Sequence, residues 1–145
     1  MNTKLYGMFF LMFFVSCSNE EEANAPIVDA NSEKWELVQT TIPFTGVETT
    51  GLDMQWQEYY ILNTNATFLK FRDWEGEVKE ASGTYLTKTM EDKEFLELTY
   101  AIGEELIATC TGDNKEQLTY TKGGFLRGNW DACDGPVLVY EKLQK

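Results

Sequence analysis

The sequence has 145 residues and a formal net charge of −12, from 24 acidic and 12 basic side chains, and it contains no histidine. The acidic balance argues against nucleic-acid binding, because neutralising phosphates requires clustered Lys and Arg side chains. Without histidine, the chain cannot form a Ser-His or Cys-His nucleophile, a His-ligated metal site or an imidazole switch near neutral pH. The apolar fraction of 43% is ordinary for a folded protein. The length allows one domain, or one domain preceded by a leader.

Residues 1–16 predict a secretory signal peptide. Lys4 supplies a short positive region, and an apolar run of about eleven residues follows it, from Leu5 to Val15. This run is too short to cross a bilayer, for which roughly twenty apolar residues are needed. It fits the central region of a secretory signal.

The sequence Val15-Ser16-Cys17 resembles the lipobox of bacterial lipoproteins, and Ser18 to Glu22 resembles the acidic export signal of surface-exposed lipoproteins in Bacteroidota-like bacteria. The first resemblance implies that the Cys17 thiol is acylated and becomes the new N-terminus. Residues 17–32 lack aromatic side chains and predict a lipidated, acidic, disordered tether. We therefore expect a protein that its lipid anchors in the outer membrane, exposed at the cell surface. The alternative is an ordinary signal peptide with an incidental cysteine.

Residues 33–145 predict one domain of short strands with little helix. Apolar and polar side chains alternate in eight segments, and no window sustains a helical period. The predicted strands are 34–42, 55–62, 66–73, 77–87, 94–101, 105–110, 116–121 and 137–143, and a Gly-rich loop, 122–136, precedes the last. Gly83 predicts a bulge or bend. Short connections favour antiparallel neighbours in chain order, and such a meander can close into a barrel without exposed edges.

Once Cys17 carries the lipid, Cys110 and Cys133 remain. In an exported chain, one remaining pair most simply forms a disulfide. Closing a loop of this length stabilises the fold by about 3 kcal/mol. The alternatives are weaker, because a metal site needs more ligands than two distant thiols and a redox pair usually reads Cys-x-x-Cys.

Several stretches of the domain resemble the lipocalin-like domain of small bacterial lipoproteins. They are Ser82 to Tyr85, Phe95 to Thr99, Thr109-Cys110 and, as the most specific part, Ala132 to Tyr140, which includes Cys-Asp-Gly-Pro. The resemblance covers roughly residues 33–143 and implies an all-β fold, an eight-stranded antiparallel meander closed into a lipocalin-like barrel with the cysteine pair at one side. Trp35 resembles the tryptophan that closes one end of such a barrel. The resemblance implies little about a ligand, because this architecture serves many roles.

Two sets of residues are candidates for binding. Aromatic and apolar side chains at alternating strand positions are expected to line the barrel, either around a small apolar ligand or as a filled core. This candidate lining consists of Tyr60, Phe71, Tyr85, Leu98, Tyr100, Tyr120 and Tyr140. Phe125 and Trp130, in the Gly-rich loop, are candidates for contact with a protein partner.

The sequence favours a binding protein over an enzyme. It contains no G-x-S-x-G, G-x-G-x-x-G or P-loop motif, and we expect no cofactor. Asp113, Asp131 and Asp134 lack the spacing of an EF-hand, so no metal site is expected. A hydrolase that uses carboxylates alone is the catalytic alternative. The two leading hypotheses are a carrier of a small hydrophobic ligand and a protein-interaction module with a filled barrel, such as an envelope accessory subunit or a protease inhibitor.

Overall fold

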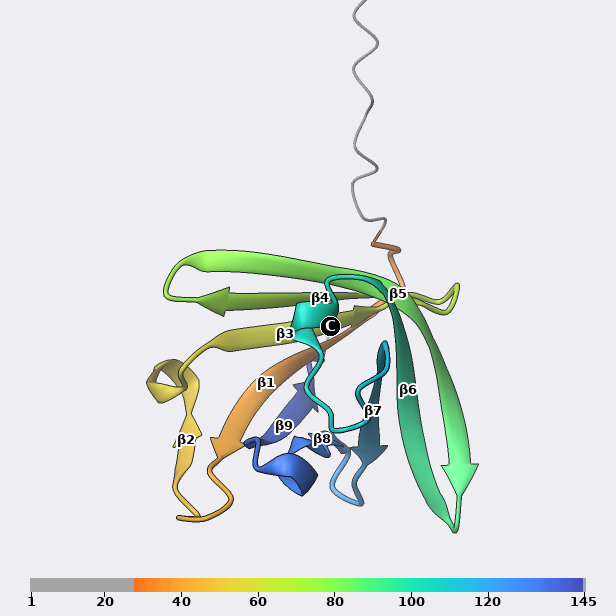
Figure 1. The fold of residues 1–145 in the computed structure, drawn as a ribbon. Coiled ribbons are helices and arrows are strands. Elements are labelled where there is room, and N and C mark those ends of the chain that lie inside the picture. The colour runs from red at the N-terminus through yellow and green to blue at the C-terminus, as the bar shows by residue number, and fades with distance from the viewer. Residues whose placement is uncertain (1–27, 145) are drawn as a thin grey trace, which may run out of the picture.

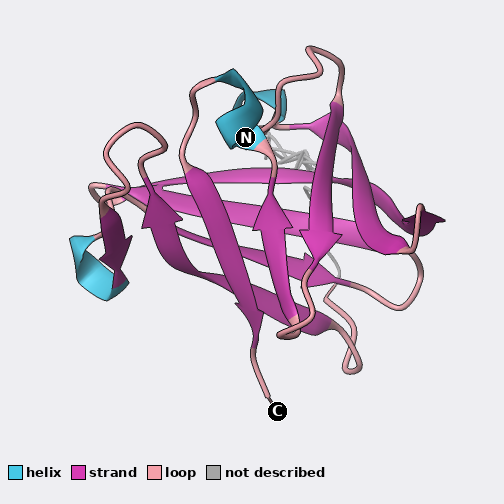
Figure 2. Ribbon diagram, turned by 90° about the horizontal axis from the view of Figure 1, so that it is seen from below, coloured by secondary structure: helices cyan, strands magenta, loops and turns pink. Residues whose placement is uncertain are grey.

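The computed structural model describes residues 28–144, so that Cys17, residues 1–16 and most of the predicted tether lie outside the described residues. Strands dominate, and three short 3-10 helices (η) lie between them (Figure 2). The strands are β1 (Glu33–Thr41), β2 (Glu48–Thr50), β3 (Gln57–Leu62), β4 (Thr67–Trp74), β5 (Glu77–Met90), β6 (Lys93–Ile102), β7 (Lys115–Tyr120), β8 (Phe125–Gly128) and β9 (Val137–Lys142). The 3-10 helices are η1 (Gly51–Asp53), η2 (Glu104–Leu106) and η3 (Trp130–Cys133). None of the described helices combines the length and hydrophobicity that crossing a bilayer requires.

The strands form a closed antiparallel barrel. From β3 to β9 each strand pairs with the next in chain order, and β1 pairs with both β3 and β9, which closes the sheet. Figure 1 shows β1, in orange, beside β9, in blue. β2 is a three-residue strand that pairs with the end of β1. The predicted all-β, eight-stranded antiparallel meander closed into a barrel is therefore confirmed, with β2 as an additional strand.

The prediction of a strand over residues 105–110 is wrong. Gly103, with a φ of 77°, follows β6, and the chain then forms η2 and continues without regular structure. The segment has an alternating pattern because Leu106 and Ala108 pack into the core from outside the sheet. The eighth barrel strand is instead β8, inside the segment predicted as a Gly-rich loop. β8 buries alternate side chains. It lies between the Gly123-Gly124 turn and η3, and its four residues are too few for the alternation to be recognised in the sequence.

Gly83 produces the predicted irregularity in β5. The register between β5 and β6 shifts between Ser82 and Gly83. A Cβ atom at position 83 would lie 1.9 Å from the carbonyl oxygen of Thr99 and 2.9 Å from the ring of Phe68. Glycine is required here because the neighbouring backbone approaches too closely for any side chain.

A short helix outside the sheet covers the barrel near one end, and side chains of the strands fill it near the other. η2 covers one end, where the carbonyl oxygen of Leu106 accepts hydrogen bonds from Lys70 at 2.7 Å and from Arg72 at 3.3 Å. Towards the other end, Trp35 is buried and packs edge-on against Tyr120, with 5.9 Å between the ring centroids. The interior is therefore shielded from solvent at both ends.

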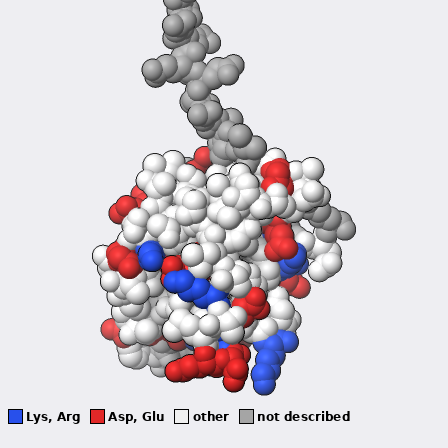
Figure 3. Space-filling model, turned by 90° about the vertical axis from the view of Figure 1, so that its right-hand side faces the viewer, with Lys and Arg blue, Asp and Glu red and all other residues white. Residues whose placement is uncertain are grey.

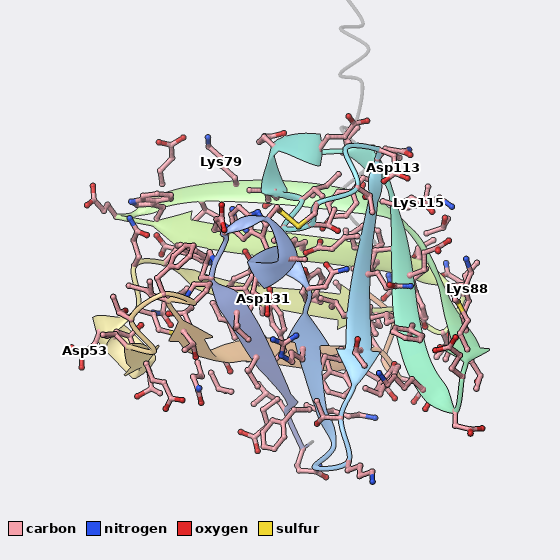
Figure 4. The ribbon with its side chains drawn as sticks, turned by 60° about the horizontal axis from the view of Figure 1, so that its bottom comes forward. Asp53, Lys79, Lys88, Asp113, Lys115 and Asp131 are labelled. Atoms are coloured by element: carbon pink, nitrogen blue, oxygen red, sulfur yellow. A yellow bond between two sulfur atoms is a disulfide. The ribbon has the colours of Figure 1, made fainter. Side chains whose placement is uncertain are left out.

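The Cys110–Cys133 disulfide joins the segment after η2 to η3, and it is the yellow bond in Figure 4. The pairing predicted from the cysteine count is therefore confirmed. The bond connects two segments that the strand pairing does not hold.

Candidate binding site

The candidate lining residues divide into an inner, an edge and an outer group. Tyr60, Leu98, Tyr100 and Tyr140 lie in the barrel interior and are at most 1% exposed. Tyr85 and Tyr120 are partly buried and pack against the margin of the core. The remaining candidate, Phe71, lies elsewhere.

Phe71 does not line the barrel, which corrects the prediction. Side chains alternate between the two faces of a strand, and its neighbours Lys70 and Arg72 are buried inside. Phe71 consequently faces outward, where its ring stacks on that of Tyr59 with 4.8 Å between centroids. Strand β4 thus places charged side chains inside and an aromatic ring outside, because the charges find partners within the barrel.

These partners form an ion-pair network that links β3, β4 and β7. Lys70 Nζ lies 3.2 Å from Glu58 Oε1 and 3.1 Å from Glu116 Oε2. Arg72 Nε donates a hydrogen bond to Glu58 Oε2 at 2.5 Å. Two carboxylates therefore face two cations, so that the buried charges balance. Such a balance is needed because an unpaired charge inside a protein is strongly unfavourable.

Two tyrosine hydroxyls complete the network. Tyr140 donates to Glu58 Oε1 at 2.5 Å, and Tyr100 donates to Glu116 Oε2. Burial, followed by the charge of the adjacent carboxylate, raises the pKa of both hydroxyls. Both therefore remain protonated at neutral pH and act as donors.

Glu58 is ionised in the folded protein. Burial on its own would raise the pKa of its carboxyl group, but attraction to Lys70 and Arg72 and hydrogen bonds from Tyr140 and Arg72 outweigh this effect. The pKa of Glu58 therefore lies below its usual value. The network consequently contributes to stability only while this carboxylate remains charged.

The interior around this network is filled. A void large enough to hold water would leave part of its lining accessible, whereas Tyr60, Tyr140 and Lys70 are each 0% exposed. The rings of Tyr60 and Tyr140 contact each other edge-on, with 5.1 Å between centroids. The inner tyrosines therefore pack against each other and against the buried charges, and leave no space there for a ligand.

Sequence reasoning did not identify the charged members of this network. No clear signal was present in the sequence, because Lys70 and Arg72 follow one another on the same face of β4 and interrupt its apolar pattern. The opposite face holds Leu69 and Phe71 and was therefore predicted to be the inner one. The partners of the two charges could not be named either, because Glu116 lies 46 residues from Lys70.

One surface cleft has a volume of about 480 Å³ and lies between the β4–β5 hairpin and η2. We call it the Trp74 cleft. It is lined by Arg72, Trp74, Glu75, Glu77, Lys79, Glu105 and Leu106. Trp74 is 44% exposed, and Lys79 projects from β5 at the top of Figure 4. This cleft opens to solvent and is separated from the inner tyrosines by the buried ion pairs.

The second cleft, the Trp56 cleft, has a volume of about 310 Å³ and lies where the end of β1, the η1 region and the segment after η3 meet. It is lined by Thr40, Ile42, Pro43, Thr49, Asp53, Gln55, Trp56, Asp134 and Pro136. Trp56 is only 7% exposed, and its indole Nε1 makes no hydrogen bond within the described part of the chain. The ring is held in place by stacking on Trp74, at 5.8 Å, and by the Arg72 guanidinium, at 5.0 Å.

Exposed apolar side chains lie on the segments that line the Trp56 cleft. We call Ile42, Phe44, Val47 and Leu52 the loop patch, since they lie in the β1–β2 loop and in η1. Phe44 is 80% exposed and Leu52 is 94% exposed. Clustered exposed apolar side chains commonly mark interaction sites. The cleft and the loop patch are therefore a candidate interaction surface.

Phe125 and Trp130 do not form a joint surface. Phe125 begins β8, whereas Trp130 lies in η3, beyond the other end of that strand. Trp130 packs against the core, and a Cβ atom at Gly135 would lie 2.4 Å from its ring. The glycine of the Cys-Asp-Gly-Pro sequence is therefore required to seat this tryptophan. In η3, next to Trp130, Asp131 forms an ion pair with Arg127 at 2.7 Å (Asp131 is labelled in Figure 4).

The side of the molecule over β5 and β6 carries acidic and basic side chains next to one another (Figure 3). Glu97 accepts hydrogen bonds from Lys88 at 2.6 Å and from Lys115 at 3.1 Å. These hydrogen bonds lower the pKa of Glu97. Because these charges neutralise one another, they attract a charged partner less strongly than a cluster of unpaired charges would.

Comparison with protein-family models, curated proteins and solved structures finds no match to this chain. Between residues 28 and 144, no three Cys, Asp or Glu side chains are placed so that they could hold a metal ion together. The function must therefore be argued from the sequence motifs, the packing of the interior and the two clefts.

Proposed function

We propose that this chain is a lipid-anchored cell-envelope binding protein whose lipocalin-like barrel is a filled scaffold that binds a protein partner on its outer surface. The observation that carries the proposal is the packed interior. Tyr60 and Tyr140 are 0% exposed and Lys70 occupies the space between Glu58 and Glu116. Because rearranging buried ion pairs is costly, binding on the outer surface requires the least change in structure. We propose binding rather than catalysis.

The sequence before the barrel supports the anchor and the location. A short apolar run, a lipobox-like sequence at Cys17 and the acidic residues after it are typical of a lipoprotein exposed on the outer membrane. We expect Cys17→Ala to release the protein from membranes or to block its maturation. Fractionation of envelope and soluble proteins measures this, with Ser18→Ala as the matched control that remains anchored. A processed Cys17→Ala protein that stays in the membrane would refute the lipid anchor.

The position of the loop patch supports a partner outside the membrane. The described chain begins beside the β3–β4 turn, where Asp29 accepts hydrogen bonds from the backbone and hydroxyl of Thr64, both at 2.7 Å. The patch lies beyond the other end of β1, which has nine residues and therefore spans about 30 Å. A chain anchored through its N-terminus thus presents the patch on the side away from its attachment point.

A small ligand at the Trp74 cleft is the second candidate function. The Trp74 cleft has a volume of about 480 Å³, which lies within the range of small-molecule sites. The exposed ring of Trp74 offers one apolar wall beside charged side chains. In this case the ligand would bind at the mouth of the barrel rather than among the inner tyrosines.

Native mass spectrometry of the full chain, extracted gently from its membrane, separates the two functions. A complex with a second protein in a fixed ratio is the expected result. A small additional mass that is lost on denaturation, and that Trp74→Ala abolishes, would instead establish the second function. A bare chain in repeated preparations, including preparations cross-linked before extraction, would contradict the proposal of a protein partner.

A further inference from the structure

The Trp56 cleft contains a buried donor without an acceptor. Trp56 is more than nine-tenths buried, lines the cleft, and has no hydrogen-bond partner for its indole nitrogen among the described residues. An indole N–H can only donate, and a buried donor that lacks an acceptor is unfavourable. Stacking on Trp74 holds the ring where it is. The Nε1 atom itself has almost no accessible surface, so that Trp56 lines the cleft through its other atoms and not through its N–H group.

Part of the cleft wall is apolar, and the segments that form it also carry the loop patch. Ile42, Pro43 and Pro136 line the cleft. Phe44 and Leu52, each of which is next to a lining residue in sequence, are more than three quarters exposed. A volume of about 310 Å³ is at the lower end of the range for binding pockets. It suits one apolar side chain together with the adjoining backbone rather than a whole domain.

The charged side chains of the cleft are both acidic, beside the uncharged polar residues Thr40, Thr49 and Gln55. Asp53 and Asp134 line it, and neither forms an ion pair with any residue that the structure describes. Figure 4 shows Asp53 on η1 at the margin of the molecule. The whole chain carries a formal charge of −12, which steers basic partners towards it. The charges of the cleft therefore favour a lysine or arginine in the bound segment.

We propose that the Trp56 cleft and the loop patch dock an extended segment of a partner protein in which an apolar side chain is followed closely by a lysine or arginine. The apolar side chain lies against Ile42, Pro43 and Pro136 beside the buried Trp56, and the basic side chain pairs with Asp53 or Asp134. This inference rests on the proposed function and names the chemistry of the partner.

Other occupants fit the surface less well. A second copy of this chain is itself strongly acidic, so that bringing two copies together adds repulsion. A membrane surface with anionic headgroups would repel Asp53 and Asp134. The patch also lies at the end of β1 opposite to the start of the described chain, and therefore opposite to the predicted anchor. A basic, apolar protein segment avoids all three difficulties.

The test uses the full chain in its own membrane, with a photoreactive phenylalanine analogue in place of Leu52 and, as the control, in place of Lys88 on the β5–β6 face. The expected result is a cross-link from position 52 to one protein, at a peptide that contains an apolar residue next to a lysine or arginine. Cross-linking from position 88 alone would leave the proposed function intact but overturn this inference. A cross-link from position 52 to lipid, to a second copy or to a segment without a basic residue would also overturn it. No cross-linked protein from either position would contradict the proposed function itself.

A second measurement examines the contacts. The cross-linked segment is synthesised and added to the full chain in detergent, and the indole N–H signals of its tryptophans are followed by NMR. The Trp56 signal should shift, and Asp53→Asn and Asp134→Asn should each weaken binding about two- to fivefold at low salt. The control Asp113→Asn removes an exposed aspartate outside the cleft and should leave the affinity unchanged. A Trp56 signal that does not move, or equal weakening by all three variants, would contradict the assigned contacts.

Discussion

Replacing Lys70 with methionine should destabilise the barrel, because it leaves two buried carboxylates with a single cation. In the native structure the Lys70 ammonium group lies 3.2 Å from Glu58 and 3.1 Å from Glu116, and its side chain is 0% exposed. After the substitution, Arg72 still pairs with Glu58, but no cation remains beside Glu116 among the described ion pairs. Methionine retains most of the length of the lysine side chain, so that the loss is mainly electrostatic.

The expected loss follows from the burial of this pair. Removing one partner of a buried ion pair costs about 3–5 kcal/mol, because the other charge is left without compensation. Solvent does not screen the charges here, since both side chains are fully buried. For a domain of this size, 1 kcal/mol corresponds to a change of about 4 °C in Tm. Lys70→Met should therefore lower Tm by about 12–20 °C.

Thermal and urea unfolding followed by circular dichroism provide the measurement. The matched control is Lys88→Met, which removes a partly exposed lysine paired with Glu97 and should cost at most about 1 kcal/mol. The difference between the wild type and Lys70→Met should also shrink as the pH falls, because protonation removes the unpaired buried charge. A loss below about 1 kcal/mol at neutral pH, or a loss that does not change with pH, would refute the electrostatic argument.

Three further predictions concern stability. Reducing the disulfide between Cys110 and Cys133 should lower the free energy of unfolding by about 3 kcal/mol in urea titrations with and without a reductant, and an unchanged midpoint would show that the bond does not constrain the unfolded chain. Gly83→Ala should cost about 1–3 kcal/mol or more by the same titration, since its Cβ would lie 1.9 Å from the oxygen of Thr99; a neutral effect would mean that β6 moves freely. Because the pKa of Glu58 is lowered from 4.5 on folding, its contribution is present above pH 4.5 and disappears as the pH falls through the folded-state pKa. Glu58→Gln should therefore flatten the dependence of stability on acid pH, and an equally steep dependence in this variant would exclude Glu58 as its source.

Local sequence was sufficient for the class of fold and for part of its geometry. Alternating side chains identified most strands, and short turns implied an antiparallel order in the chain, because neighbouring strands then pair without long crossovers. The disulfide followed from the number of cysteines, and the bend at Gly83 followed from glycine within a strand. Each of these features depends on residues close together in sequence or on a simple count.

Alternation of apolar and polar residues predicted strands wrongly in two places. One segment buries side chains without pairing with a strand, and the other pairs with its neighbours over only a few residues. Residues 105–110 alternate because Leu106 and Ala108 are buried, yet their backbone forms no strand. β8 has only four residues and gains its place from β7 and β9 on either side. A pattern of burial does not specify which backbone hydrogen bonds accompany it, and only the assembled barrel determines that.

The amino-acid sequence by itself determined that this protein forms an antiparallel barrel with two distinct strand faces and one disulfide. It did not determine which face of β4 lies inside, because alternation has the same period for both faces. Tertiary structure placed Lys70 and Arg72 inside and Phe71 outside, since Glu58 and Glu116 on other strands neutralise the two cations. It also brought Asp134 into one cleft with Asp53 and Trp56, which lie much earlier in the chain. Buried charges and surface clefts depend on partners that the fold brings together, and for that reason only the tertiary structure could reveal them.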